Sequence, residues 1–302
     1  MPPAFVMITP AYNEAGYIGR TIESVLAQSV LPQRWVIVDD GSTDATSQIV
    51  SEYARQHDWI RLVRRFKDPQ QSYYSSNVYA IFEGIKNLGE IQYDYLAIVD
   101  ADIELPKNYY SRIFERFEQD EKLGIASGIY MDRLGENQFR KVLSDRRSTP
   151  KALMVFRRKC FEQIGGFIPM KYGGEDTVAC FAARMHGWKT WSFPDLVAIH
   201  NKPIGTGHSK GLLKIRFRQG IGEYFAGSHP LFVISKSLRR SVKERPLVLG
   251  GLCRLTGFLW ASLKHEKRQI SDAMIRYIRK EQIGRLWKRN KIPSEFAVEL
   301  TV

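Results

Sequence analysis

The sequences WVIVDD at residues 35–40 and YLAIVDAD at residues 95–102 decide the fold of this chain. Each is an apolar run, rich in valine and isoleucine, that stops abruptly at aspartates. Continuous apolar runs of this kind are typical of parallel strands that are buried on both faces of a sheet. Ligands of open α/β sheets bind just beyond the carboxyl ends of the strands, so we expect both acidic clusters on one edge of one sheet.

The residues around these two runs alternate between strand and helix patterns. Apolar runs predict strands at 4–9 and 60–65, and helical spacing is found at 14–28, 45–57 and 76–88. This alternation predicts an α/β fold, with a Rossmann-like, mostly parallel sheet flanked by helices. Farther along, the same patterns predict helices at 107–117 and 176–185 and strands at 125–131, 152–156, 190–193 and 196–199.

Charge divides the chain into two parts. The formal net charge is +13; residues 201–302 carry 21 Lys and Arg against 7 Asp and Glu, whereas residues 1–200 carry 24 against 25. A basic tract of this kind indicates an anionic partner, such as lipid headgroups, nucleic acid or a phosphate-bearing substrate. Because residues from 210 onward also have a helical pattern, we expect an α/β domain at 1–209 and a helical, basic C-terminal region at 210–302.

The most apolar window of the chain, PLVLGGLCRLTGFLWASL at 246–263, lies in this basic region. It is shorter than the roughly 20 residues of a spanning helix, contains Arg254 and is flanked by Lys and Arg. Residues 270–287 combine apolar and basic side chains in a pattern typical of a helix that lies on an anionic membrane. These patterns predict association with a membrane surface; the alternative is a buried core helix followed by a solvated one.

Cysteine usage favours a reducing compartment. Cys160, Cys180 and Cys253 are odd in number, far apart and without metal-ligand spacing. The N-terminal residues MPPAFVMITP run directly into a strand pattern, so no signal peptide is expected. We therefore expect a cytoplasmic protein that is peripheral on the cytoplasmic face of the membrane.

The carboxylates after the second acidic strand suit a metal ion. Asp100 and Asp102 are two residues apart and flank the small Ala101. Such a pair can hold a hard divalent cation, Mn²⁺ or Mg²⁺, and carboxylates with such an ion commonly bind a diphosphate.

Five segments in one order carry a family resemblance: ITPAYNEAGYIGRTIESVLAQS, VIVDDGSTDAT, IVDAD, GGF and GGED. Together they resemble family 2 glycosyltransferases, which are inverting, nucleotide-sugar-dependent enzymes with the GT-A fold. The resemblance covers about residues 5–200. It implies a metal-dependent enzyme whose donor is a nucleotide-diphosphate sugar, with UDP favoured and GDP or dTDP as alternatives.

The resemblance implies a donor site after the first two strands. Pro10, Ala11, Tyr12 and Glu14 would lie around the base and ribose, the alternative being a simple strand-to-helix turn. Asp40 would accept the N–H of the base edge, which suits a carboxylate because it only accepts hydrogen bonds. Helix capping is the alternative for this acid.

The resemblance also implies the metal and donor-sugar contacts. Asp102 would coordinate the cation directly, and His200 would complete the metal shell or serve a structural role. Asp100 would reach the ribose, or the metal through water, and Ala101 would contact the donor. The ion would neutralise the departing diphosphate. In the stretch KDPQQSYYSSN at 67–77 the sequence departs from the family, and Lys67 or Asn77 is expected to substitute there.

The acceptor side is implied by GGED. Asp176 would be the general base that takes the proton of the acceptor hydroxyl, and Glu175 would assist it on the substrate side. Gly174 would allow close approach of the backbone to the sugar. A helix N-cap is the alternative role for Asp176. Separately, the Gly-rich stretch PIGTGHSKG at 203–211 contains His208 and Lys210 and follows Lys202, and we expect this loop and its cations to close on the diphosphate.

These patterns predict an inverting glycosyltransferase that acts on a glycan or lipid-linked acceptor, in the synthesis of cell-surface polysaccharide or glycoconjugate. A nucleotidyltransferase acting on a sugar phosphate is one alternative, although TPAYNE stands where such enzymes have a Gly-rich basic loop. A non-catalytic membrane- or nucleic-acid-binding protein is the other. No nucleic-acid-binding signature is recognised, so nucleic acid is not expected as a partner.

Overall fold

The structure is a computed structural model that describes residues 3–142, 145–202 and 211–287. It divides into two compact units, Met1–Gly211 and Leu212–Val302. The first unit is built around a sheet, and the second unit is helical.

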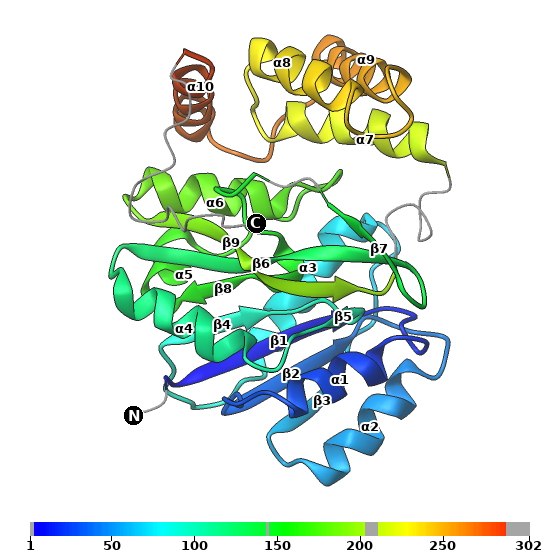
Figure 1. Cartoon of the computed structure of the whole chain (residues 1–302), viewed down its shortest axis with the longest axis vertical. Coiled ribbons are helices and arrows are strands. Elements are labelled where there is room, and N and C mark those ends of the chain that lie inside the picture. Colours follow the sequence, from blue (N-terminus) through cyan, green and yellow to red (C-terminus); the bar gives the residue numbers. More distant parts are fainter. Residues whose placement is uncertain (1–2, 143–144, 203–210, 288–302) are drawn as a thin grey trace. The chain divides into compact units, whose positions relative to one another are not determined.

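The sheet of the first unit contains nine strands in the order β3-β2-β1-β4-β8-β6-β9-β5, with β7 paired to β6 (Figure 1). Its strands are β1 (Phe5–Ala11), β2 (Arg34–Asp39), β3 (Ile60–Arg64), β4 (Tyr95–Ile98), β5 (Ile103–Glu104), β6 (Leu123–Gly135), β7 (Gln138–Lys141), β8 (Val155–Arg157) and β9 (Lys189–His200). The helices of this unit are α1 (Ile18–Leu26), α2 (Thr46–Gln56), α3 (Tyr73–Lys86), α4 (Tyr109–Gln119), α5 (Arg158–Ile164) and α6 (Glu175–Met185), with a 3-10 turn at Lys151–Leu153.

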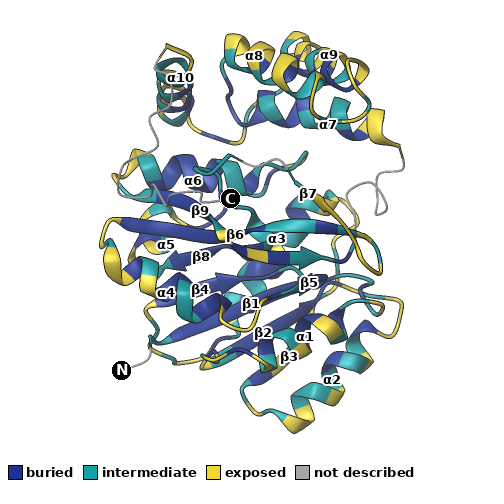
Figure 2. Ribbon diagram, viewed as in Figure 1, coloured by how far each residue is buried: buried dark blue, intermediate teal, exposed yellow. Residues whose placement is uncertain are grey.

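The apolar runs form parallel strands that are covered on both faces, as predicted. Alternate side chains of β1 point to opposite sides of the sheet. Phe5 packs against Tyr110 and Phe114 of α4, with ring centroids 4.8 and 5.0 Å apart. Ile8 belongs to the core on the other side, where a Cβ at Gly84 of α3 would lie 2.7 Å from its Cγ2. Figure 2 shows β1, β2 and β4 buried along nearly all of their length, whereas β3 at the edge of the sheet is partly exposed.

The mostly parallel sheet flanked by helices is confirmed, and antiparallel pairing is confined to β5, β7 and β8. The two short strands predicted at 190–193 and 196–199 are one strand, β9. Its pairing with β6 shifts between Phe193 and Val197. Pro194 in this interval has no N–H to donate, and Asp195 accepts from Arg112 at 2.5 Å instead of pointing into the sheet.

The second unit consists of α7 (Leu212–Phe225), α8 (Pro230–Ser241), α9 (Leu249–Lys264) and α10 (Asp272–Trp287). Helices α7 and α9 cross closely because glycines lie at the contact. A Cβ at Gly220 would lie 1.9 Å from the Arg254 carbonyl oxygen, and a Cβ at Gly257 would lie 2.0 Å from that of Phe217. Side chains at these positions would force the helices apart.

The structure corrects one expectation for this unit. Ile270, Ile275 and Ile278 are buried and do not form an exposed apolar face, and the exposed large apolar side chains are Leu286 and Trp287 at the end of α10. A Cβ at Gly227 would lie 3.0 Å from Ile270 and from Ile275, so these side chains pack against the backbone that joins α7 to α8. Within the described residues, no helix is both long enough and apolar enough to span a bilayer.

Candidate functional site

A solvent-open pocket of about 430 Å³ lies where β1 and β4 end. The pocket is lined by Pro10, Ala11, Tyr12, Glu14, Asp40, Tyr73, Asn77, Asp100, Ala101 and Asp102. Eight of the residues predicted for the donor and metal therefore share one cavity, as expected for strand ends at one edge of a sheet. Gly174, Glu175, Asp176 and His200 are not in this lining.

Acids that line the pocket and acids that do not line it act on the same tyrosine side chains. Burial raises the pKa of Tyr73, and the carboxylates of Asp100, Glu14, Asp102 and Glu175 raise it further. Burial also raises the pKa of Tyr130, with added contributions from Asp132, Asp176, Asp100 and Asp102. Carboxylates from the segments after β1 and β4, from β6 and from the start of α6 thus act on the same two tyrosines.

The loop after β4 is held by three contacts. Thr21 Oγ1 donates to the Ala101 carbonyl oxygen at 2.8 Å, and the Asn201 amide donates to the Asp102 carbonyl oxygen at 2.9 Å. Lys151 Nζ donates to Asp100 Oδ1 at 2.7 Å. The Asp102 side chain, which is 11% exposed, is directed toward His200 of β9.

His200, the last residue of β9, lies between two carboxylates. Its Nε2 is 3.2 Å from Asp102 Oδ2, and its Nδ1 is 2.8 Å from Asp132 Oδ1. Asp132 is fully buried and also accepts from Arg140 at 2.7 Å. Burial lowers the pKa of His200, but the hydrogen bonds to Asp102 and Asp132 outweigh this effect and raise the pKa to about 10.

This arrangement fits a divalent cation. Two neighbouring ligands in an octahedral shell with bonds of 2.0–2.1 Å lie about 3 Å apart, close to the 3.2 Å between Asp102 Oδ2 and His200 Nε2. Asp132 on the other imidazole nitrogen has the place of the outer carboxylate that orients a metal-bound histidine. Within the described residues no group of three or more His, Cys, Asp or Glu is arranged to hold an ion. Further ligands would then be substrate oxygens and water, as is usual for Mg²⁺.

The two acids after β2 have different surroundings. Asp39 accepts from the Ser42 amide at 2.8 Å and from the Ser47 hydroxyl, and so supports the turn. Asp40 accepts from Ser76 Oγ at 2.5 Å and forms an ion pair with Arg65. Burial raises the pKa of Asp40, while Ser76 and Arg65 oppose the increase. A carboxylate has about four acceptor positions, so Asp40 retains capacity for one more donor.

Buried acceptors in the pocket have no protein donor. Glu14 Oε2 and Asn77 Oδ1 make no hydrogen bond within the described residues. Glu14 Oε1 accepts from Lys202 at 2.7 Å, yet burial raises the pKa of Glu14 to about 7. The ammonium of Lys67 lies 4.2 Å from the centre of the Tyr12 ring. Buried polar atoms normally have partners, so the orphaned acceptors indicate that a ligand donates to them.

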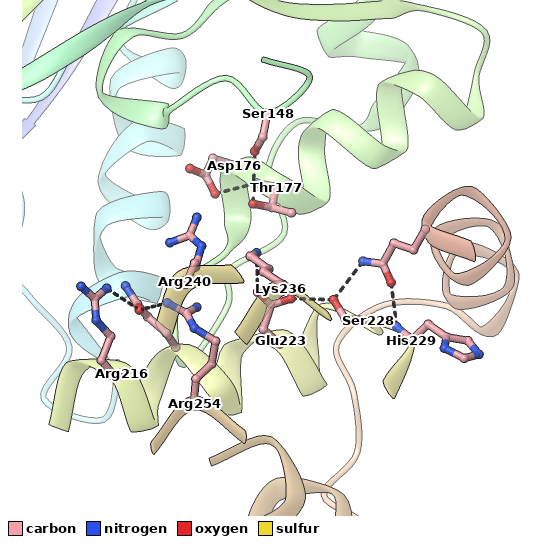
Figure 3. A network of polar contacts seen from close by, with 12 residues as sticks. Ser148, Asp176, Thr177, Arg216, Glu223, Ser228, His229, Lys236, Arg240 and Arg254 are labelled. Carbon is pink, nitrogen blue, oxygen red and sulfur yellow. Dashed lines mark hydrogen bonds and ion pairs between the residues drawn. The ribbon is translucent and has the colours of Figure 1, made fainter. Parts of the chain in front are cut away.

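Glu175 and Asp176 begin helix α6 (Figure 3 shows Asp176 and Thr177). The structure does not support the N-cap role for Asp176, because the capping position is Gly174, whose φ of 102° favours glycine. Asp176 accepts from the Thr177 amide at 2.6 Å. Burial raises the pKa of Asp176; burial and then the neighbouring Asp176 raise that of Glu175 to about 7.

Sequence reasoning missed three residues of this site. Lys151, Asp132 and Arg65 contact Asp100, His200 and Asp40, respectively. None belongs to a recognised motif, and Asp132 lies within the long strand β6. A buried acid in a strand is itself a signal, because it needs a partner. His208 and Lys210 lie outside the described residues.

The sequence around this site matches a known protein family. The profile named Glycosyl transferase family 2 matches residues 6–178, which include the pocket-lining residues and the start of α6. The chain belongs to glycosyl transferase family 2. The family assignment agrees with the resemblance carried by the five sequence segments.

Named relatives are similar to this chain over part of their length. The poly-beta-1,6-N-acetyl-D-glucosamine synthase of Staphylococcus aureus (strain MSSA476) is 32% identical over 117 residues, which are 39% of this chain and 26% of that protein. The corresponding protein of Staphylococcus epidermidis is 31% identical over the same length. The chain thus matches about a quarter of the length of these relatives.

Solved structures share the fold at low identity. The mannosyltransferase PcManGT from Pyrobaculum calidifontis, in complex with GDP-Man and Mn²⁺, has a TM-score of 0.57 at 17% identity, covering 96% of this chain and 82% of that one. S. aureus TarS 1–349 in complex with UDP-GlcNAc has a TM-score of 0.54 at 14% identity, covering 87% and 73%. These likenesses support a GT-A type of fold for this family member.

Proposed function

We propose that this protein is an inverting glycosyltransferase. It moves a sugar from a nucleotide-diphosphate sugar to a hydroxyl of a glycan or lipid-linked acceptor, in the synthesis of cell-surface polysaccharide or glycoconjugate. The observation that carries the proposal is the pocket at the ends of β1 and β4, which joins Asp102 and orphaned acceptors in one cavity. Membership of glycosyl transferase family 2 supports the reaction class.

The nucleotide of the donor binds along the Pro10–Glu14 segment in this proposal. Tyr12 packs on the base, while Asp40 accepts the N–H of the base edge. Glu14 and Asn77 have acceptor oxygens without protein donors, which suits the hydroxyls of a ribose. UDP is the favoured nucleotide, with GDP and dTDP as alternatives; the structures of similar fold were solved with UDP-GlcNAc and GDP-Man.

Asp102 and His200 hold Mn²⁺ or Mg²⁺ in this proposal. When bound, the cation supplies positive charge that neutralises the diphosphate as it departs. The Asp132 carboxylate keeps the His200 imidazole oriented toward Asp102. Asp100 and the backbone at Ala101 contact the donor, and Lys151 positions Asp100.

Asp176 acts as the general base in this proposal. It takes the proton from the acceptor hydroxyl, whose oxygen forms a bond to the anomeric carbon as the bond to the diphosphate oxygen breaks. One displacement inverts the configuration. Burial raises the pKa of Asp176 above the usual aspartate range, which makes its carboxylate a stronger base. Glu175 beside it and Gly174 border the acceptor sugar.

The basic C-terminal unit brings the enzyme to the membrane in this proposal. Residues 201–302 carry 21 Lys and Arg against 7 Asp and Glu, and anionic leaflets attract such segments. The acceptor is then presented at the cytoplasmic face.

A donor panel tests the proposed reaction. Thermal unfolding with UDP, GDP and dTDP plus Mn²⁺ identifies the nucleotide that raises the midpoint. Release of nucleoside diphosphate is then measured with sugar donors of that nucleotide. We expect Asp102→Asn to lower turnover on the order of 10²–10³-fold.

Asp58→Asn is the matched control, because Asp58 is exposed and does not line the pocket. It should leave turnover unchanged. Turnover that survives Asp102→Asn, or release of pyrophosphate from a nucleoside triphosphate and a sugar phosphate, would refute the proposal.

A further inference from the structure

Helix α9 buries small residues and an arginine and exposes large apolar side chains. The residues that point inward are Gly250, Gly251, Arg254, Gly257, Phe258 and Ala261, all of them buried. The exposed side carries Leu249, Leu252, Leu259, Trp260 and Leu263. In a helix of a water-soluble domain, the large apolar side chains normally face the core and the charged ones face water. Helix α9 therefore presents its apolar side outward.

The polar interior of this unit explains the inward face. Arg254, which is 3% exposed, donates to Gln219 at 2.6 Å and lies 3.6 Å from Glu244. Glu244 also accepts from Arg240 at 2.7 Å. Figure 3 shows this cluster of guanidinium groups converging within the helical unit. Charges buried among partners occupy space that apolar side chains would otherwise fill.

A second buried pair extends the same polar interior. Lys236 of α8 donates to Glu223 of α7 at 2.5 Å, and Ser228 donates to the other oxygen of Glu223 at 2.7 Å (Figure 3). Helix α8 is consequently turned so that Leu231, Ile234 and Leu238 are exposed. The segment between α8 and α9 adds Val242, Leu247 and Val248, and Val242 is 72% exposed.

We define these residues as the outer apolar face of α8 and α9: Leu231, Ile234, Leu238, Val242, Leu247, Val248, Leu249, Leu252, Leu259, Trp260 and Leu263. Leu263 is 79% and Leu238 is 62% exposed. Extended apolar exposure of this kind marks a surface that is covered in the functional state.

The charges around this face favour an anionic partner. Exposed cations lie in and next to the same helices, at Arg239, Lys243, Arg245, Lys264 and Lys267. Between residues 230 and 264 the one acidic residue is Glu244, and its carboxylate is bound by Arg240 and Arg216. Lys264 also lies 4.4 Å from the centre of the Trp260 ring. Tryptophan beside lysine is a common anchor at the level of lipid headgroups.

We infer that the outer apolar face of α8 and α9 docks on an anionic lipid bilayer, with its leucines in the acyl boundary and its cations among the headgroups. This inference deepens the proposed membrane association and rests on the proposed function for its biological purpose. The helix lies in the plane of the interface, since its 16 residues span about 24 Å, less than the roughly 30 Å hydrocarbon core. The inferred membrane face is thus formed by α8 and α9.

Vesicle flotation of the full chain tests this inference. Vesicles of phosphatidylcholine with 30% phosphatidylglycerol should bind the protein, and pure phosphatidylcholine should bind it far less. The triple variant Leu252→Asn, Leu259→Asn, Leu263→Asn should bind at least about tenfold less, because apolar burial and charge act together. These side chains are exposed, so the variant should keep its unfolding midpoint.

A matched control replaces exposed apolar residues of the sheet unit, Leu31→Asn, Leu134→Asn and Phe139→Asn, and should bind vesicles like the parent. A second variant, Lys243→Gln, Arg245→Gln, Lys264→Gln, should bind less and lose much of the salt dependence. Equal binding by the Asn triple and the parent would overturn the inference. So would failure of the parent to bind, or a concentration-dependent dimer that the Asn triple abolishes.

The nucleotide-dependent midpoint shift is measured on the same preparations. If vesicle binding is absent while a nucleotide with Mn²⁺ still raises the midpoint, only the docking surface is wrong. If vesicle binding follows the expected pattern while no donor is turned over, only the proposed reaction is wrong.

Discussion

Two buried glutamates, one in each unit, show how differently the two units treat charge. Burial acts to raise the pKa of Glu175 in the sheet unit and of Glu223 in the helical unit. Next to Glu175 lies another acid, Asp176, and the pKa of Glu175 reaches about 7. Next to Glu223 lie Lys236 and Arg254, and the pKa of Glu223 falls to about 2. The pKa values of these two glutamates are therefore shifted in opposite directions, although burial acts in the same direction on both.

The surroundings of these glutamates differ because the sheet unit contains the candidate site, whereas in the helical unit the charges hold the helices together. In the sheet unit Glu14, Asp40 and Asp100 each have a cation beside them, whereas Glu175 and Asp176 are adjacent acids that share the charge of Lys151. Two adjacent buried acids cost stability, and proteins keep such an arrangement mainly where it is used. In the helical unit each buried carboxylate has basic partners, which stabilise the packing of α7, α8 and α9. The surplus of cations there then remains available for an anionic partner.

The largest effect is expected from Asp176→Asn, which keeps the size of the side chain and removes its basicity. Glycosyl transfer should fall about 10²–10⁴-fold, the usual contribution of a general base. Thermal stabilisation by the nucleotide and Mn²⁺ should persist, because Asp176 does not line the donor pocket. Initial rates and midpoint shifts on one preparation measure both. Asp195→Asn, at the bend of β9, is the control and should retain activity.

The next effect contrasts Glu223→Gln with Glu175→Gln in urea unfolding at pH 7. Glu223→Gln leaves Lys236 without its carboxylate partner; because the Lys236 side chain is 30% exposed, this should cost about 2 kcal/mol, less than the loss of a fully buried pair. Glu175→Gln removes a buried charge that Lys151 offsets only in part, since the pKa of Glu175 is still raised, so the free energy of unfolding of this variant should equal or exceed that of the parent. Destabilisation of similar size in both variants would show that the two units do not differ as described.

The pH dependence of stability sharpens the contrast. An acid with a lowered folded pKa stabilises above its unfolded pKa, so the contribution of Glu223 is lost as pH falls from about 4.5 to about 2. An acid with a raised folded pKa does the reverse, so Glu175 destabilises increasingly as pH rises from about 4.5 to about 7. Each shift corresponds to about 3 kcal/mol.

Urea titrations at intervals from pH 3 to pH 8 measure these slopes as differences from the parent. The advantage of the parent over Glu223→Gln should shrink toward low pH. The advantage of Glu175→Gln over the parent should grow toward pH 7. Parallel curves for both variants and the parent would contradict the assigned pKa directions.

The strands and the donor side of the pocket were predictable from the sequence because their signals are local. Apolar runs that end in acids show both the strand and the edge where it ends, as at Asp40 and Asp102. The faces of α9 were not predictable in the same way. The window 246–263 is apolar as a whole, and only the polar interior set by Glu223 and Arg254 determines which side is exposed.

The partners of the acids were unpredictable for a related reason. Lys151 lies in a 3-10 turn 51 residues after Asp100, and Asp132 lies 68 residues before His200. Sequence patterns do not show pairs at such separations, since the pairing depends on β8 and β6 lying near β4 and β9 in the sheet. Asp100 and Asp176 are also far apart in the chain, and Lys151 interacts electrostatically with both of them.

Lys151→Met gives the smallest effect and tests that contact. Lys151 lowers the pKa of Asp176 both by its charge and by its backbone N–H, although burial keeps the pKa raised. Removal of the ammonium should raise the pKa of the base, so the acidic limb of the rate–pH profile should move to higher pH by about one unit, within the range for one nearby opposite charge. Lys151→Arg retains the charge and should leave the limb near its original position. If Lys151→Met lowers the rate but does not shift the acidic limb of the rate–pH profile, Lys151 only positions Asp100. Burial alone would then account for the raised pKa of Asp176.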